Sequence, residues 1–235
     1  MELDAARRTK KGGQTRARIL NAATTLFRER GYEETTMRGI ARAAGVSLGN
    51  TYYYFPSKES LIQAFYGQTH HDHLEAVEPV LAKEKKLDRR LRGVMKAKLD
   101  TIMPFHRFAG VLFRTAADPE SPLNPFSEES SKVRGDATAL FDEVVRGSDA
   151  KIPKQLEAEL PELLWLYHMG VILYWVHDRS PGCRRTYALS ETTVDLVVRI
   201  ISLGSHPLLR PLLRSGLQVL AQLKEPDRAT TSAKN

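Results

Sequence analysis

The sequence predicts an all-α protein in which a small N-terminal helical unit precedes a larger helical domain. Apolar residues recur at the i, i+3, i+4 spacing along most of the 235 residues, and no segment shows the alternation of a strand. Residues 1–60 contain 11 Lys or Arg and 6 Asp or Glu, which is +5 of the total net charge of +7. The N-terminal unit is therefore expected to have a role of its own.

The first two helices are marked by apolar spacing and by residues that end or cap a helix. Apolar residues within 19–27 share one face of a helix that Gly31 ends. Either Thr35 or Thr36 can cap a second helix, and Gly45 ends it. The short turn between the two helices makes them neighbours in space.

A third, short helix follows after one more turn. Ser47 can accept hydrogen bonds from free amides at its start, and Pro56 requires the helix to end by Tyr54 or Phe55. Two short helices joined by a tight glycine-containing turn form the helix-turn-helix pattern, in which the second helix enters the DNA major groove. The tyrosine run of this helix cannot be buried on one side, so at least one ring faces outward.

The rest of the chain contains further amphipathic helices. The expected segments run from Ser57 to about Ala82, Leu87 to Met103, Phe105 to Ala116, Val133 to Val144, Leu163 to Val176, Ser190 to Gly204, and about Pro207 to Leu223. In the second of these segments the apolar residues are expected to point inward and the cations of LDRRLR outward. Ser190 is the expected cap of the last long helix.

Composition excludes several classes of protein. The one cysteine, Cys183, cannot form an intramolecular disulfide, and the first residues lack the apolar stretch of a secretory signal. The longest apolar stretch, 163–176, is short of the ~20 residues that cross a bilayer. The chain is therefore expected to be soluble and cytoplasmic, with no membrane partner.

A basic stretch precedes the helix-turn-helix. Residues 7–18 contain six cations and no anion, namely Arg7, Arg8, Lys10, Lys11, Arg16 and Arg18. Such a stretch is typical either of an arm attracted to nucleic-acid phosphates or of a solvated, disordered tail, and the sequence favours neither. Residues 1–14 are accordingly expected to form a flexible basic arm.

A dense set of residues from Thr15 to about Leu61 carries a specific resemblance. It consists of RARILNAATTLFRERGYEETTMRGIARAAGVS followed by Gly49, Tyr52, Tyr54, Phe55, Ser57, Lys58 and Leu61. This pattern resembles the tetracycline-repressor (TetR) family of bacterial transcription regulators. The resemblance implies a DNA-binding domain over 15–60, a helical ligand-binding and dimerisation domain over 61–223, and a polar tail over 224–235. It also implies a homodimeric repressor, released from an inverted-repeat operator by a small hydrophobic or aromatic effector.

Candidate DNA contacts lie at the start of each helix of this unit. Leu48 suits a thymine methyl, Asn50 suits a base edge, and Gly49 permits close approach of the backbone. The resemblance assigns phosphate contacts to the hydroxyls of Tyr52 and Tyr54 and to Lys58, and Tyr53 is expected to point to the groove or its wall. Thr51 and Phe55 are expected to point inward. The full expected set is Thr36, Arg38, Leu48, Gly49, Asn50, Tyr52, Tyr53, Tyr54 and Lys58.

The C-terminal helices suggest a dimer. Segment 163–176 is apolar on nearly every face, and segment 190–203 has a second apolar face formed by Leu196, Ile200 and Leu203. A two-fold four-helix contact would bury these surfaces. The alternative is that both helices lie wholly inside a large monomer.

The resemblance places a ligand pocket among the aromatic residues of these helices. The candidates are Phe105, His106, Phe108, Phe113, Phe141, Tyr167, His168, Tyr174 and Trp175. In the run HHDH, His70 and His73 share a helical face, but two ligands do not make a metal site, and surface histidines are the expected explanation. No metal or cofactor is expected.

Two other classes of function were weighed. An enzyme is disfavoured because the sequence contains no GxSxG, P-loop, dinucleotide fingerprint or HExxH. An architectural protein that binds DNA without an effector is the alternative to a regulator.

Overall fold

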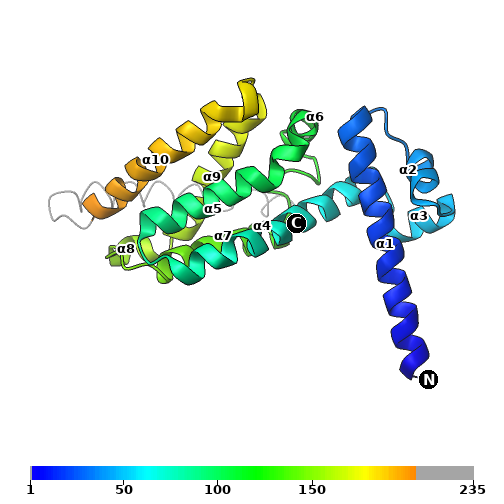
Figure 1. The fold of residues 1–235 in the computed structure, drawn as a ribbon, viewed down its shortest axis with the longest axis horizontal. Helices are drawn as coiled ribbons and strands as arrows, with labels where there is room; N and C mark the ends of the chain where they lie inside the picture. The colour runs from blue at the N-terminus through cyan, green and yellow to red at the C-terminus, as the bar shows by residue number, and fades with distance from the viewer. Residues whose placement is uncertain (1, 205–235) are drawn as a thin grey trace, which may run out of the picture.

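The computed structural model describes residues 2–204, and every regular element in that range is helical, which confirms the predicted fold class. Figure 1 shows α2 and α3 packed beside α1 at one end of the molecule, with the remaining helices gathered at the other. The helices are α1 Glu2–Arg30, α2 Met37–Ala44, α3 Leu48–Tyr54, α4 Lys58–Lys83, α5 Leu87–Ile102, α6 His106–Ala116, α7 Ser131–Arg146, α8 Lys154–Glu157, α9 Leu160–His177 and α10 Arg184–Leu203. Short 3₁₀ turns, η1 Met103–Phe105 and η2 Pro181–Cys183, precede α6 and α10.

The helix-turn-helix follows its capping signals. The Thr36 hydroxyl accepts a hydrogen bond from the Gly39 amide at the start of α2, and the Ser47 hydroxyl accepts one from the Asn50 amide at the start of α3. Gly45 ends α2 with a φ of 62°, a left-handed conformation that glycine adopts without strain. The cap of α2 is therefore Thr36, one of the two threonines that the sequence allowed.

Helix α4 connects the two parts of the molecule. It begins with a capping box in which Ser57 and Ser60 bond each other's amides, and it continues through Pro79 to Lys83. Its first half packs against α1, and its second half packs along α5 (Figure 1). A tilt of α4 would therefore move the helix-turn-helix relative to the rest.

Two apolar cores meet along α4. The C-terminal core is formed by α4, α5, α7, α9 and α10. The N-terminal core contains residues of α1 to α3, and also Phe65 of α4 and Phe108 and Leu112 of α6. The ring of Phe108 stacks on Phe27 of α1 with centroids 5.2 Å apart. Helix α6 thus belongs in part to the core of the N-terminal unit.

The structure differs from the expected bounds of two helices. Helix α1 begins at Glu2, within the segment 1–14 that was expected to form a flexible basic arm. Helix α10 begins at Arg184 rather than at Ser190, because Asp178 accepts from the amide and hydroxyl of Thr186 and anchors an earlier start. The expected helix at 207–223 and tail at 224–235 lie outside the described residues.

Arg90, expected to point outward, is buried. Its guanidinium donates to the carbonyls of Leu81 and Glu84 at the end of α4 and to those of Glu143 and Val144 at the end of α7. The Glu143 carbonyl also accepts from the amide of Gly147, which caps α7. Carbonyls at the end of a helix lack the amides of a following turn, so the arginine supplies donors to both helix ends. A hydrophobic pattern alone could not distinguish this arginine from its exposed neighbour Arg89.

Candidate nucleic-acid interface and ligand cavity

The N-terminal end of α3 is open to solvent. Gly49 and Asn50 are exposed and Leu48 is half-buried. A Cβ atom added to Gly49 would meet only the Ser47 hydroxyl, at 4.0 Å. Packing within the protein therefore does not require glycine at this position, which favours a requirement imposed from outside.

The three tyrosines of α3 have different surroundings. Tyr53 is 79% exposed and Tyr52 is 48% exposed, whereas Tyr54 is half-buried with its ring edge-on to Tyr53 at 5.1 Å. A Cβ on Gly12 of α1 would lie 3.5 Å from the Tyr54 hydroxyl, so that hydroxyl lies close to the first helix. Two of the tyrosines are therefore presented outward, and the third joins α3 to α1.

The residues expected to point inward do so. Thr51 is fully buried, and Phe55, directly after α3, is 2% exposed in the N-terminal core. The guanidinium of Arg16 lies 4.8 Å from the centre of the Phe55 ring. Arg18 donates to the carbonyls of Ala44 and Gly45 at the end of α2. Two cations of the basic stretch are thus in contact with the helix-turn-helix itself.

The other candidate DNA contacts surround α3. Thr36 and Arg38 are exposed at the start of α2. Lys58, at the start of α4, donates to the carbonyl of Tyr32 at 3.0 Å and lies 4.2 Å from the centre of its ring. The ammonium has three N–H donors, so this carbonyl holds the Lys58 side chain in place and leaves donors for a phosphate.

A cavity of about 230 Å³ lies between α4, α5, α6, α7 and α9. Most of its wall is aromatic or aliphatic, including Phe65, Phe108 and both tryptophans of the chain, Trp165 and Trp175. The loop between α6 and α7 closes one side with Leu123 and Pro125. Arg134 of α7 holds this loop by donating to the carbonyls of Pro125 and Ser127.

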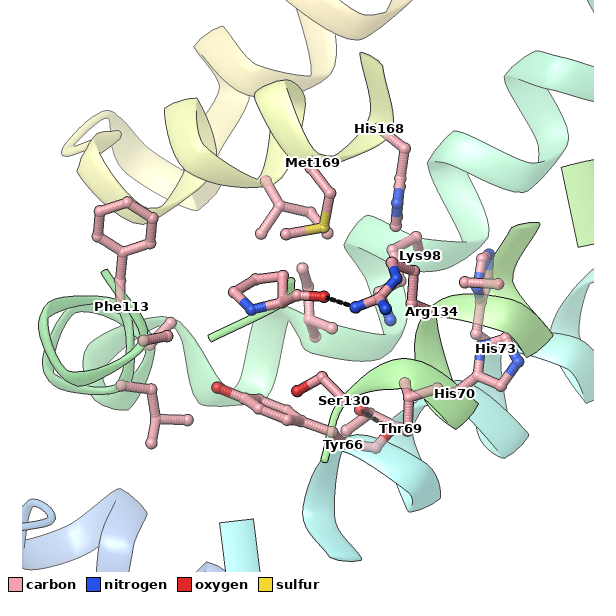
Figure 2. A pocket seen from close by; sticks show the side chains of 18 of the residues that line it. Tyr66, Thr69, His70, His73, Lys98, Phe113, Ser130, Arg134, His168 and Met169 are labelled. Atoms are coloured by element: carbon pink, nitrogen blue, oxygen red, sulfur yellow. Dashed lines mark hydrogen bonds between the residues drawn. The ribbon is translucent and has the colours of Figure 1, made fainter. Parts of the chain in front are cut away.

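The polar residues of the cavity are grouped on one side. Figure 2 shows Lys98, Arg134, His70, His73 and His168 near one another, with Phe113 at the opposite end. The rings of His73 and His168 are stacked with centroids 6.3 Å apart. Among the described residues, the lining contains no aspartate or glutamate. The polar side is therefore rich in hydrogen-bond donors and has no anion.

Burial changes the protonation of this group. Burial, reinforced by the charge of Lys98, lowers the pKa of His73 to about 3 and holds the pKa of His168 well below its ordinary value. The same causes lower the pKa of His70, and burial lowers the pKa of Lys98 to about 8. At neutral pH the histidines are therefore uncharged, and the lysine carries the charge.

Six of the nine sequence-predicted pocket residues line the cavity: Phe105, Phe108, Phe113, Phe141, His168 and Trp175. Three do not. The ring of His106 bonds the Trp175 carbonyl, the Tyr167 hydroxyl bonds Thr193 of α10, and Tyr174 is 42% exposed. Because α9 is apolar on nearly every face, the spacing of its apolar residues does not show which of them face solvent. The sequence therefore could not separate residues that line the cavity from residues on the protein surface.

Most of the polar side of the cavity was not predicted from the sequence. His70 and His73, expected on the surface, are buried. Lys98 and Arg134 also line the cavity. A signal was available for Lys98, because it lies three residues after Met95 and four before Ile102, on the apolar stripe of α5.

An apolar surface lies on α9 and α10. Its exposed members are Leu166, Leu173, Tyr174, Leu196, Ile200 and Leu203. We call these six residues the α9–α10 face. None of the described helices has the length and the continuous apolar character needed to span a bilayer.

Family models match both parts of the chain. A model for "Bacterial regulatory proteins, tetR family" matches residues 19–65, and one for "Tetracyclin repressor-like, C-terminal domain" matches residues 90–219. The chain is 31% identical over 185 residues to the HTH-type transcriptional regulator TtgR of Pseudomonas putida, covering 72% of this chain and 84% of TtgR. The resemblance found in the sequence is thereby confirmed.

Solved structures agree with this fold. The regulator FadR from Bacillus subtilis, solved in complex with stearoyl-CoA, aligns with a TM-score of 0.59 at 17% identity, covering 77% of this chain and 97% of FadR. FadR from Thermus thermophilus, in complex with lauroyl-CoA, aligns with a TM-score of 0.57 at 24% identity, covering 78% and 92%. The chain therefore belongs to the tetR family of bacterial regulatory proteins, and it is a DNA-binding transcriptional regulator.

Proposed function

We propose that the protein is a homodimeric repressor that leaves an inverted-repeat operator when a small apolar molecule occupies the cavity. In this proposal residues 15–60 read DNA, and residues 61–223 bind the effector and form the dimer. The observation that carries the proposal is the overlap of cavity wall and N-terminal core. Phe65, Phe108 and Leu112 belong to both.

The overlap provides a physical route from effector to DNA. Phe108 contacts the cavity on one side and stacks on Phe27 of α1 on the other. A molecule that fills the cavity would displace α6 and the first half of α4, and these support α1. A coupling of about 1–3 kcal/mol would weaken operator binding roughly 5- to 150-fold.

The α9–α10 face supports the dimer. Six large apolar side chains exposed on two adjacent helices are typical of an interaction surface, and a second copy of the chain would bury them symmetrically. Two recognition helices about one DNA turn apart, roughly 34 Å, would then read the two halves of a palindrome.

The DNA-reading residues follow from exposure. Gly49 and Asn50 would meet base edges, with Leu48 against a thymine methyl. Tyr52, Tyr53, Thr36 and Arg38 would contact the backbone around them. Tyr54 and Lys58 are placed in the same region, but each is also in contact with the protein.

The nature of the effector is supported by the cavity wall and by the solved relatives. The wall is mainly aromatic and aliphatic, and the two FadR structures were obtained with long-chain acyl-CoA molecules. We therefore expect an effector with an apolar hydrocarbon part for this protein as well.

Selection of bound duplexes from a random pool, followed by anisotropy titration of the winner, tests the proposal. The selected duplex should be an inverted repeat that binds one dimer, and an apolar extract of the native host should weaken its binding. Equal affinity for selected and random duplexes would contradict sequence-specific regulation. Specific binding that no apolar molecule weakens would favour the architectural alternative.

A further inference from the structure

We propose that the effector is an apolar carboxylic acid whose carboxylate is bound by Lys98 and His168. The inference rests on the proposed function, because it takes the cavity as the effector site. Beyond the proposed function, the inference gives the chemical class of the effector's head group and the direction in which the effector lies in the cavity. The apolar part of the acid would extend from Lys98 toward Phe113, across the cavity (Figure 2).

Lys98 supplies a positive charge that the protein does not neutralise within the cavity. Within residues 2–204, its ammonium has no hydrogen bond or ion pair, and the lining contains no carboxylate. The carboxylate that acts on it, Asp72, is exposed and accepts a hydrogen bond from Gln68. A cation kept beside apolar walls without a counter-ion is costly, and an anionic ligand would remove that cost.

His168 supplies a second, independent observation. It is 5% exposed, and neither ring nitrogen has a hydrogen-bond partner in the described structure. A neutral histidine carries one N–H, so a donor is buried without an acceptor. Such groups are rare in folded proteins, because the lost hydrogen bond to water is not replaced. A carboxylate oxygen in the cavity would accept from this ring.

The neighbouring His73 and Arg134 differ from Lys98 in having hydrogen-bond partners within the protein. His73 already donates from Nε2 to the carbonyl of Val94, at 2.9 Å. Arg134 is held by the carbonyls of Pro125 and Ser127. Lys98 is therefore the one cation of the described lining that makes no hydrogen bond to the protein, and a carboxylate matches its single charge.

The apolar end explains why the ligand is an acid with a hydrocarbon body. Apart from the polar side, the wall is formed mainly by aromatic rings and aliphatic chains, and the buried indole nitrogen of Trp175 in this lining has no hydrogen-bond partner. The cavity volume of about 230 Å³ is below the ~300–1,000 Å³ of common ligand pockets. A fatty acid of medium length or an arylalkanoic acid has this shape.

Binding should depend on pH through Lys98. Its pKa of about 8 in the empty cavity would be raised by a bound carboxylate. Affinity is then greatest below pH 8 and decreases as the pH rises above it, because the free lysine loses its proton. The charged and titratable groups near Lys98 are His70, His73 and Asp72 of α4, Arg134 of α7 and His168 of α9, and Lys132 and Asp136 of α7 act on His70.

The test uses the intrinsic fluorescence of the full-length protein. Both tryptophans line the cavity, so a ligand that enters it changes their emission. The probes are the straight-chain carboxylates from hexanoate to dodecanoate and 4-phenylbutyrate, each compared with the alcohol of the same carbon skeleton. The best acid should bind at least about tenfold (about 1.4 kcal/mol) more tightly than its alcohol at pH 7.

Matched variants assign the effect to the lysine. Lys98→Met should abolish the preference for acid over alcohol and its pH dependence, while the alcohol still binds. Lys96→Met is the control, since Lys96 lies on the same helix but is exposed and paired with Asp100. His168→Phe should reduce the preference and keep the aromatic packing.

The outcomes separate this inference from the proposed function. Equal affinity for acids and alcohols, or no binding of any acid in the series, would contradict the proposal that the effector is a carboxylic acid. Neither result involves DNA, so selective operator binding measured in parallel would still support the repressor. An acid preference that survives in Lys98→Met would also overturn the assignment of the head group.

Discussion

Gly49 is a residue at which binding and folding can be separated. Alanine fits the space around it and is the better helix former by about 1 kcal/mol, so Gly49→Ala should leave the free energy of unfolding unchanged or slightly raised. The added methyl group would hold the backbone away from the base edges. We expect operator affinity to fall at least about tenfold, which is about 1.4 kcal/mol.

Anisotropy titration and urea denaturation of the same samples check this prediction. Gly45→Ala serves as the opposite control, because the left-handed backbone at Gly45 should make that variant less stable. An alanine at position 49 that binds the operator as well as glycine does would show that the backbone does not approach DNA closely there.

Arg90 tests whether charge or shape matters in a buried cation. Lysine keeps the charge but presents its donors at one point, and it cannot reach four carbonyls on two helices. We expect Arg90→Lys to lower the free energy of unfolding by about 2–4 kcal/mol. Arg89→Lys, at the exposed neighbouring position, should change it by less than about 0.5 kcal/mol.

Urea denaturation of both variants measures the difference. Similar stability of the two would mean that the carbonyls at the ends of α4 and α7 are satisfied in some other way. Gly147 adds a second check, because a Cβ there would lie 2.3 Å from Arg90 Nη2 and should likewise destabilise the protein.

Individual residues show where sequence reasoning succeeds. The inward position of Thr51 was expected from the resemblance to the family, which usually has an apolar or small residue there, and Phe55 was expected as the core anchor among the aromatic residues. The burial of His70, His73 and Lys98 was not predicted, because polar residues in proteins are mostly exposed. That general tendency was given more weight than the position of these residues on the apolar stripes of their helices. The cavity itself depends on how five helices pack, which no local pattern specifies.

At the scale of elements, the connection between α9 and α10 depends on one carboxylate. Burial alone would raise the pKa of Asp178, but hydrogen bonds from Ser180 and Thr186 hold it well below the ordinary value of 3.8. This contribution to stability is present above about pH 4 and is lost as the pH falls through the pKa of the folded state. Helix α10 begins where it does because these bonds organise its first turn.

Asp178→Asn should therefore destabilise the protein by about 1.5–3 kcal/mol at pH 7, and by less at acidic pH. Thermal unfolding at a series of pH values from neutral downward measures both effects. Asp142→Asn, which removes an exposed pair with Arg146, should cost less than about 0.5 kcal/mol. If the loss of stability in Asp178→Asn is as large at low pH as at pH 7, Asp178 is not ionised in the folded protein.

Element boundaries show the same limit of prediction. The starts of α2, α3 and α4 were predictable because serine and threonine caps lie directly before them. The start of α10 was not, because Asp178 lies six residues before Arg184 and acts across a turn. The extension of α1 on the N-terminal side of Thr15 was not predicted, because the charge of that segment is typical of an arm.

For the whole molecule, the α9–α10 face should control both assembly and DNA binding. Ile200→Glu places a charge at a position that is 59% exposed in the single chain, so the monomer should remain folded. Its burial in a dimer would be costly, and the variant should be monomeric by light scattering. Operator affinity should fall by at least about 100-fold, because the two half-sites are no longer bound together.

Leu74→Glu, a similar change on α4 away from this face, should leave the dimer intact. Retention of the dimer by Ile200→Glu would assign the interface to another surface. A stable monomer that binds the operator with undiminished affinity would contradict the link between assembly and recognition.

The overlap of cavity wall and N-terminal core has a genetic consequence. Ala109 and Ala137 are half-buried in the wall, and a phenylalanine at either position would fill space that an effector otherwise takes. Such an allele would behave as if the inducer were always present, and the regulated genes would be expressed constitutively. A population under selection could thus escape repression through one codon far from the operator-reading helix.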